Sequence, residues 1–173
     1  MHASPVPEPA GVDPQEFRRV VGRFATGVTV VSTVVDATDH AMTVSSFTSV
    51  SLDPVLVLFC VEKTARFHRA VLASGLWAVS VLAEDAVDAS AWFASRGRPI
   101  AGQLAGFRHR RGAHTGAAVL ADAVAALECR TRAVHDGGDH TIVLADVLDV
   151  TVPCPDAQPL VYYDGGYRSL SGS

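Results

Sequence analysis

The sequence predicts a mainly β protein, a closed or nearly closed antiparallel barrel into which three short helices are inserted. About six stretches of strand length, apolar or alternating, are separated by short turns. Only three short stretches carry helical periodicity, and no internal repeat is present. The 173 residues are enough for one domain with a substantial core and too few for two of ordinary size.

Composition argues against two classes of function. The net charge of −4 disfavours nucleic-acid binding, and the one basic cluster, residues 108–111, is interpreted as a solvated loop, with a phosphate contact as the alternative. No apolar run reaches the roughly 18 residues that a membrane span requires. Charged residues make up only 18% of the chain, which favours a surface partly covered by a partner subunit.

The N-terminal segment and the cysteines indicate a cytoplasmic protein. Residues 1–12 hold three prolines and no apolar stretch of a signal peptide, so we expect a flexible arm before a single domain of residues 13–173. Cys60, Cys129 and Cys154 show neither a CxxC spacing nor a disulfide framework. Reduced thiols are therefore expected.

The first helix is expected to begin at Asp13. Asp13 suits the N-cap, Pro14 suits the first helical position, and Glu16 can reach back as in a capping box. Apolar residues then recur at helical spacing while arginines occupy the other side, and Gly27 is placed to end the helix. The apolar face consists of Phe17, Val20, Val21 and Phe24.

Two strands follow, and the second has an unusual composition. Residues 28–35 are β-branched and apolar, and residues 36–39 form a turn that returns the chain as a hairpin. The returning strand, residues 41–51, has Ser or Thr at most positions that are not apolar, and its alternation slips at Ser45 and Ser46. These hydroxyls suit a phosphate or a ring edge, although a Ser/Thr-rich edge strand explains them as well. The residues expected to face the core are Met42, Val44, Phe47 and Val50.

The middle of the chain alternates strands with short helices. Residues 55–61 form a continuous apolar run, typical of a strand buried on both faces. Residues 64–73 predict a helix that ends at Gly75. Its inward residues are Phe67, Ala70 and Val71.

The remaining segments are also predicted to be strands, with one short helix and one long loop. Residues 76–82 predict a strand and residues 84–93 a short helix, while residues 97–116 have little periodicity and are expected to form a long functional or partner-contacting loop. Two strands joined by a turn are predicted over residues 127–150. The last strand, residues 160–163, is followed by a turn and a short C-terminal stretch.

Several common catalytic motifs are absent. No GxGxxG follows a strand, and residues 62–64 imitate the end of a P-loop without its glycines. No GxSxG elbow marks a nucleophilic serine. A zinc site on His135 and His140 lacks further ligands at a sensible spacing, so no metal site is predicted.

Four ordered stretches carry a resemblance to a known family. Residues 40–54, HAMTVSSFTSVSLDP, resemble the signature of the flavin reductase family, the small reductase components of two-component flavin-dependent monooxygenases. Residues 138–147 are similar to the family's Gly-Asp-His hairpin, and residues 159–167 are similar to its closing strand. With residues 17–31, the likeness covers nearly the whole chain beyond the arm.

The resemblance implies both a fold and an activity. The fold is an FMN-binding split β-barrel of antiparallel Greek-key type that forms a homodimer and binds FMN or FAD near the subunit interface. The activity is that of an NAD(P)H:flavin oxidoreductase, which uses NADH or NADPH and supplies reduced flavin by diffusion to a separate flavin-dependent oxygenase. The alternatives are a flavin-retaining oxidase or monooxygenase on the same fold and a non-enzymic flavin-binding module.

The resemblance also implies the site residues. The hydroxyls of Ser45 and Ser46 suit the flavin phosphate. The cations of Lys63 and Arg66 suit it as well. His140 is the expected catalytic residue, in a positioning role beside the hydride path rather than as a general base. The implied cofactor-binding positions are His40, Ala41, Met42, Thr43, Val44, Ser45, Ser46, Cys60, Val61, Glu62, Lys63, Arg66, Phe67, Trp92, Tyr163, Asp164, Gly165 and Gly166.

Simpler explanations stay open for three of these residues, and two positions depart from the family pattern. Arg66 suits a helix surface, Trp92 suits core packing, and His140 suits the start of a strand. The family usually has Gly where Ala41 stands and Arg where Asp164 stands. An acid at position 164 removes a cation from the turn that the resemblance places near the nicotinamide nucleotide, so that contact and any preference for NADPH stay open.

Overall fold

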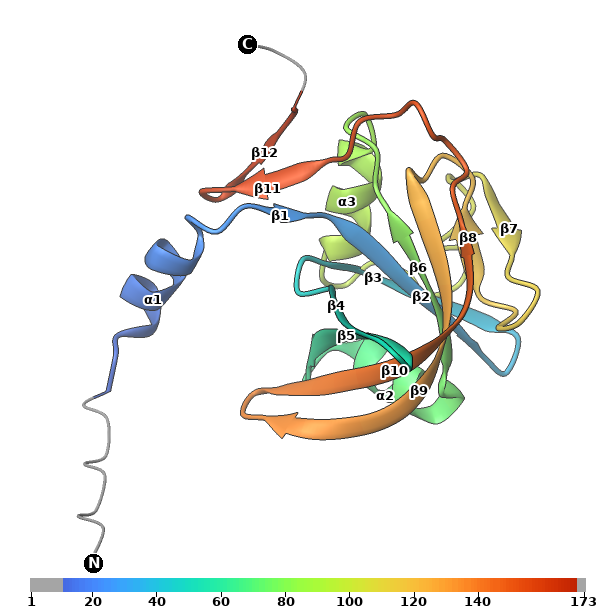
Figure 1. Ribbon diagram of the computed structural model, residues 1–173, viewed down its shortest axis with the longest axis horizontal. Helices are drawn as coiled ribbons and strands as arrows, with labels where there is room; N and C mark the ends of the chain where they lie inside the picture. The colour runs from blue at the N-terminus through green and yellow to red at the C-terminus, as the bar shows by residue number, and fades with distance from the viewer. Residues whose placement is uncertain (1–10, 171–173) are drawn as a thin grey trace, which may run out of the picture.

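The main body is one antiparallel sheet of seven strands. The computed structural model describes residues 11–170, and its sheet has the strand order β3-β2-β6-β9-β10-β5-β4 (Figure 1). The two edge strands, β3 and β4, are consecutive in sequence, so residues 45–47 join the two edges of the curled sheet. The mainly β prediction is confirmed. The strands are β2 (Thr29–Val35), β3 (Thr38–Val44), β4 (Thr48–Leu52), β5 (Val55–Glu62), β6 (Leu76–Val81), β9 (Ala125–Gly137) and β10 (His140–Thr151).

The single strand predicted over residues 41–51 is wrong. The chain bends at residues 45–47, where the alternation slips, so that β3 pairs with β2 while β4 pairs with β5 on the opposite edge of the sheet. Val50 was expected in the core but is 47% exposed. The reason is that β4 is an edge strand whose register with β5 shifts between Ser49 and Ser51.

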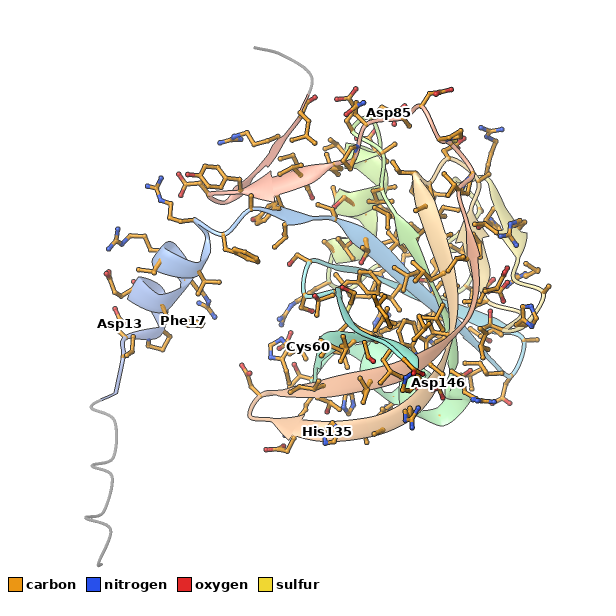
Figure 2. All side chains as sticks on the ribbon, in the orientation of Figure 1. Asp13, Phe17, Cys60, Asp85, His135 and Asp146 are labelled. Atoms are coloured by element: carbon orange, nitrogen blue, oxygen red, sulfur yellow. The ribbon has the colours of Figure 1, made fainter. Side chains whose placement is uncertain are left out.

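The first helix, α1 (Pro14–Val21), begins as predicted and ends early. The Asp13 carboxylate accepts a hydrogen bond from the Gln15 N–H, whereas Glu16 binds Arg19 instead of reaching back to the cap. Gly22 ends the helix before Gly27 is reached. The helix lies apart from the main sheet (Figures 1 and 2), and no residue of α1 is buried. Phe17 and Phe24 are 58% and 75% exposed.

A small second sheet holds α1 in place. It consists of β1 (Thr26–Gly27), β11 (Val161–Tyr163) and β12 (Gly166–Arg168), in the order β1-β11-β12. The turn between β11 and β12 is formed by Asp164 and Gly165, both at positive φ, which confirms the predicted turn. The Asp164 N–H donates to the Gly22 carbonyl over 2.8 Å, and the Arg23 guanidinium lies 3.6 Å from the Asp164 carboxylate.

Two short helices cover the body and position the site. In α2 (Arg66–Ser74) the predicted inward residues are buried, and Gly75 ends the helix at φ +65°. The other helix, α3 (Val87–Ala94), begins later than predicted and packs on β3, where the Thr43 hydroxyl donates to the Ser90 carbonyl over 2.7 Å. None of the described helices is long and apolar enough to cross a membrane.

Strand β5 is buried on one face rather than two. Val57, Phe59 and Val61 lie in the core, while the intervening residues are half-buried. The prediction that β5 is buried on both faces is wrong for a single subunit, because the core of that subunit covers only one face of the strand. The half-buried residues are Leu56, Leu58 and Cys60.

The segment after α3 contains a short hairpin. The basic cluster lies largely in an exposed strand, β7 (His109–Arg111), which pairs with β8 (Ala118–Leu120), so the loop prediction is wrong there. The connection is fastened by Glu128, a 2% exposed carboxylate that accepts hydrogen bonds from the N–H groups of residues 113–115. Burial opposes this charge, but the hydrogen bonds outweigh burial and lower the pKa of Glu128.

Candidate functional site

A cavity of about 380 Å³ brings together several residues predicted from the sequence. It lies between β3, the end of β5, the start of α2 and the segment that follows α3. Met42, Glu62, Arg66 and Phe67 line it, all of them predicted cofactor-binding residues. We call it the basic cavity, and it is lined by Met42, Glu62, Thr64, Ala65, Arg66, Phe67, Phe93, Ala94, Ser95, Arg96, Gly97 and Arg98.

The apolar wall of the basic cavity contains Phe93, and the segment that follows this residue brings Arg98 over the cavity. Phe93 is 0% exposed near the end of α3, and its ring centroid lies 4.9 Å from that of Phe107. The helix ends at Ser95 in an extended conformation, which turns the following residues back over the cavity. The Arg98 guanidinium lies 5.7 Å from the Phe93 ring centroid, within range of a cation–π contact.

Arg98 is the most constrained polar side chain of the cavity. Its two terminal nitrogens donate to the carbonyls of Ala41 and Ser95, the second bond measuring 2.8 Å. Its Nε atom is buried and has no hydrogen-bond partner among the described residues. Burial and the nearby Arg66 charge lower the pKa of Arg98. A buried donor of this kind suits an anionic ligand.

The cavity carries an excess of positive charge. Arg66 donates to the Arg98 carbonyl over 2.6 Å, and within residues 11–170 neither Arg66 nor Arg98 has a carboxylate partner. Glu62 is the one carboxylate in the lining, and it pairs with Arg96 at 2.9 Å. A hydrogen bond from Thr64 and the Arg96 charge lower the pKa of Glu62. Three guanidinium groups thus face one carboxylate.

The row of hydroxyls over residues 41–51 is partly used by the protein itself. The Ser46 hydroxyl donates to the Cys60 carbonyl over 3.1 Å and accepts from the Cys60 N–H over 3.0 Å, so it ties residues 45–47 to β5. Ser45 is exposed and forms no hydrogen bond with a described residue. The side chains of Val44 and Val61 are buried in the core, which leaves only their backbone atoms for a ligand.

The other predicted polar residues lie at the edge of this site. His140 stands opposite Glu62 in the β10–β5 ladder, and its Nδ1 lies 2.7 Å from an Asp139 carboxylate oxygen. Lys63 is occupied by an ion pair with Asp136. His40 is half-buried, and burial lowers the pKa of its imidazole.

Two groups of predicted residues do not join the basic cavity within one chain. Tyr163, Asp164, Gly165 and Gly166 lie in the second sheet beside α1. Trp92 is not part of the lining, and its indole N–H donates to the Gln103 carbonyl over 2.9 Å. These residues were expected near a cofactor because of the family resemblance. The resemblance identifies positions in the sequence, but it does not give the distances between those positions within one subunit.

Sequence reasoning missed eight of the twelve residues of the lining. A signal was present, because an Arg-Gly-Arg triplet follows directly after the aromatic end of a helix in a chain with few charges. The long irregular segment after that helix was treated as one unit, which concealed the triplet. Among residues 11–170, no cluster of His, Cys, Asp and Glu side chains is arranged to hold a metal ion. The missed residues are Thr64, Ala65, Phe93, Ala94, Ser95, Arg96, Gly97 and Arg98.

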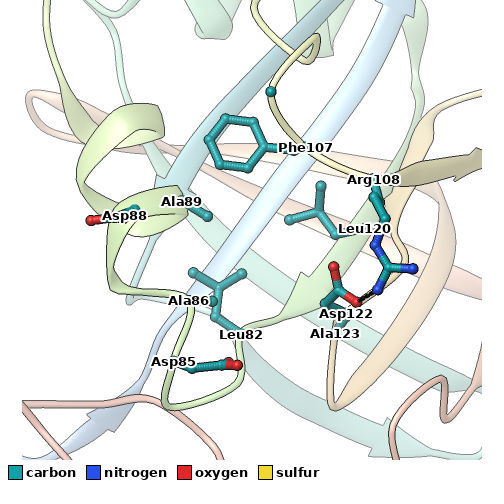
Figure 3. Close-up of a pocket in the computed structure, with 11 residues that line it drawn as sticks. Leu82, Asp85, Ala86, Asp88, Ala89, Phe107, Arg108, Leu120, Asp122 and Ala123 are labelled. Atoms are coloured by element: carbon teal, nitrogen blue, oxygen red, sulfur yellow. Dashed lines mark hydrogen bonds and ion pairs between the residues drawn. The ribbon is translucent and has the colours of Figure 1, made fainter.

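A second cavity, of about 370 Å³, lies at the other end of α3 (Figure 3). Its floor is apolar and its rim carries Asp85, Asp88 and Asp122, of which Asp122 forms an ion pair with Arg108. It contains none of the residues predicted as cofactor-binding. We call it the acidic cavity, and it is lined by Leu82, Asp85, Ala86, Asp88, Ala89, Gly106, Phe107, Arg108, Leu120, Asp122 and Ala123.

Comparison with known proteins gives a consistent result over nearly the whole chain. Residues 21–171 match the family model described as flavin reductase like domain. The reductase subunit HsaB of a flavin-dependent monooxygenase from Mycobacterium tuberculosis is 39% identical over 93% of this chain and 84% of its own length. An NADH-dependent FAD reductase from Streptomyces globisporus is 42% identical over 92% of this chain and 89% of its own.

Solved structures agree with the sequence relatives. BorF, the flavin reductase component of a bacterial two-component tryptophan halogenase, superposes with a TM-score of 0.86 at 41% identity, covering 93% of this chain and all of BorF. The NADH:FAD oxidoreductase SgcE6 of Streptomyces globisporus, in complex with NAD and FAD fragments, gives a TM-score of 0.87 at 38% identity. That match covers 95% of this chain and 99% of SgcE6.

Proposed function

Because the chain belongs to the flavin reductase like family, we propose that it is an NADH-dependent flavin reductase that supplies reduced FMN or FAD to a separate oxygenase. NADH is favoured over NADPH because the named relatives of S. globisporus use NADH. The catalytic unit is the single domain from residue 13 onward. The predicted N-terminal arm of residues 1–12 lies almost entirely outside the described residues.

The observation that carries the proposal is the basic cavity. It combines an apolar wall with excess positive charge, the two properties that an aromatic ring with a phosphate-bearing tail requires. The exposed Ser45 and the Ser46–Cys60 connection continue from the cavity along β3 and β5. This places hydroxyl and backbone groups along one edge of the site, where they can hold the polar edge of a flavin ring.

The residues of the chain bind and orient, since the flavin and the nicotinamide supply the hydride chemistry when they are bound. Met42 and Phe67 form an apolar surface in the cavity, and Arg66 provides charge. His140 is proposed as a positioning residue because it stands opposite Glu62, a residue of the lining, in the β10–β5 ladder and is held by Asp139. Weak binding of the reduced product is part of the function, because that product must leave to reach the oxygenase.

A homodimer is part of the proposal, and an uncovered apolar surface supports it. Leu58 and Leu144 stand opposite each other in the β5–β10 ladder, as do Cys60 and Ile142, and all four are half-buried. The apolar face of α1 is exposed as well. Burying such surfaces against a second copy is favourable at roughly 25 cal/mol per Å². Light scattering of the purified protein tests the dimer.

Cytoplasmic localisation is also proposed. Cys60, Cys129 and Cys154 are free thiols, as expected where glutathione keeps thiols reduced. Cys129 is buried, and burial raises the pKa of its thiol to about 12, so it is not a reactive group. Fractionation of cells that produce the protein tests this assignment.

The decisive experiment measures NADH oxidation with and without added flavin. The purified protein is expected to oxidise NADH only when FMN or FAD is present and to complete many turnovers when flavin is in large excess. Comparison of NADH with NADPH in the same assay tests the donor preference. A reaction that stops after one equivalent of flavin would contradict the reductase proposal, as would a protein that retains yellow flavin and consumes NADH only with an organic substrate.

A further inference from the structure

We propose that residues 96–98 form the phosphate-binding element of the flavin site, with the Arg98 Nε–H as its central donor. The inference rests on the proposed function, and it assigns the phosphate of the flavin to residues that the family resemblance did not indicate. The chemical class of the ligand is a phosphate monoester or diester, as found in the tail of FMN or in the pyrophosphate of FAD.

Two of the four donors expected from the sequence, Ser46 and Lys63, are already engaged, whereas Ser45 is exposed and Arg66 donates only to the Arg98 carbonyl. The Ser46 hydroxyl satisfies both backbone groups of Cys60, and Lys63 is paired with Asp136. The Thr43 hydroxyl donates to the carbonyl of Ser90 in α3. A phosphate bound by these three groups would have to break protein–protein hydrogen bonds, and each exchange returns little net free energy.

Arg98, by contrast, has a donor that no described residue satisfies. Two carbonyls hold its terminal nitrogens, so the plane of the guanidinium is fixed, while the buried Nε–H has no acceptor among residues 11–170. Leaving a buried charged donor unpaired is costly, and an arginine held in one orientation loses little entropy when it binds an oxyanion. The structure therefore presents a donor that is oriented before the ligand arrives.

The local charge points to a ligand with about two negative charges. Arg66 and Arg98 have no carboxylate partner within the described chain, and Glu62 neutralises only Arg96. Outside the cavity, Arg108 and Arg111 each form an ion pair with an aspartate. A phosphate monoester carries about −1.5 to −2 at neutral pH, which matches the uncompensated charge of the cavity.

The test separates recognition of the phosphate from recognition of the ring. Affinities for FMN, FAD and riboflavin, which lacks the phosphate, are measured by flavin fluorescence for the wild type and for Arg98→Gln, Arg98→Lys and Arg108→Gln. The wild type is expected to bind FMN at least about 10-fold more tightly than riboflavin. Arg98→Gln is expected to weaken FMN by about 10- to 100-fold and to change riboflavin by less than about 2-fold.

The remaining arms distinguish the sources of the phosphate and test specificity. Arg98→Lys should fall between wild type and Arg98→Gln, because it keeps the charge and loses the Nε donor. Arg108→Gln should match the wild type. If Arg98→Gln weakens FMN and FAD alike, the ligand is the phosphate next to the ribityl chain; if it weakens only FAD, the ligand is the adenylate phosphate.

Two results would overturn the inference and leave the reductase proposal intact. One is an equal loss of FMN and riboflavin affinity in Arg98→Gln, which would show that Arg98 only supports the fold. The other is a wild type that binds FMN and riboflavin equally while still oxidising NADH. A wild type that binds no flavin and oxidises no NADH would overturn both proposals.

Discussion

The two cavities lie at opposite ends of α3 and differ in the sign and pairing of their charges. The acidic cavity has Asp88 in the first turn of the helix, where the helix dipole favours a carboxylate, and its Asp122 is paired with Arg108. The basic cavity lies where the helix ends, and it retains a buried guanidinium nitrogen that has no acceptor among residues 11–170. The difference teaches that a cavity of ordinary size is not by itself a binding site. An oriented donor that the protein does not satisfy is the stronger indication.

The largest expected effect comes from the wall near the basic cavity. Phe93→Ala removes a fully buried ring that contacts Phe107 and Arg98, so the free energy of unfolding should fall by about 3–5 kcal/mol. Urea denaturation measures it. The control is Trp92→Phe, which loses the hydrogen bond to Gln103 and part of a ring that is 37% exposed, and it should cost about 1 kcal/mol. Equal losses in the two variants would contradict the role of Phe93 as a packing wall.

Charge reversal in the two cavities should have unequal consequences for flavin binding. Arg98→Glu removes the buried donor and adds a negative charge beside the phosphate, so FMN affinity should fall by about 100-fold or more. The matched variant Arg108→Glu, at the acidic cavity, should bind FMN within about 2-fold of the wild type. Fluorescence titration provides both numbers. A loss below about 3-fold in Arg98→Glu would remove the distinction between the cavities.

Removal of the carboxylate that lines the basic cavity should increase the difference in positive charge between the two cavities. Glu62→Gln releases Arg96 and should tighten FMN binding by about 2- to 5-fold, the range expected for an exposed ion pair. The gain should shrink at high salt, which screens charges that are exposed to solvent. Asp122→Asn releases Arg108 in the same way and serves as the control, with no expected change. Weaker FMN binding in Glu62→Gln would show that this carboxylate contacts the ligand favourably.

The smallest effect is expected at the acidic rim. Asp85→Asn combined with Asp88→Asn changes exposed side chains with no ion pair in the described chain, so unfolding free energy should change by no more than about 0.5 kcal/mol. FMN affinity should stay within about 2-fold. A larger change in affinity, measured on a protein of unchanged stability, would mean that α3 transmits an effect from one cavity to the other.

Much of the fold could be predicted from local patterns because caps and strand periodicity act over short stretches. Asp13 starts α1, Gly75 ends α2, and Asp164 with Gly165 forms the last turn, each as expected. The wrong predictions concern features that depend on contacts between residues far apart in the sequence. The apolar face of α1 has helical spacing, yet periodicity does not say which surface covers it, and the structure leaves that face exposed.

The candidate site divides in the same way. The positions of Glu62, Arg66 and His140 follow from motifs in the sequence, and the structure places Glu62 and Arg66 in the lining of one cavity and His140 opposite Glu62 in the sheet. The Arg-Gly-Arg triplet is visible in the sequence, but the orientation of the Arg98 side chain could not be predicted, because it depends on carbonyls of Ala41 and Ser95 that meet only after α3 packs on β3.

The sequence by itself determined the mainly β class, the helix caps and the unusual row of hydroxyls over residues 41–51. Only the tertiary structure decided that this row divides between opposite edges of one sheet. As a result the Ser46 hydroxyl forms its hydrogen bond with Cys60 in β5. The tertiary structure also decided that the Nε–H of Arg98 is left without an acceptor among residues 11–170. The physical reason is that hydrogen-bond satisfaction and charge pairing depend on groups far apart in the chain, whereas propensity and periodicity act over a few neighbouring residues.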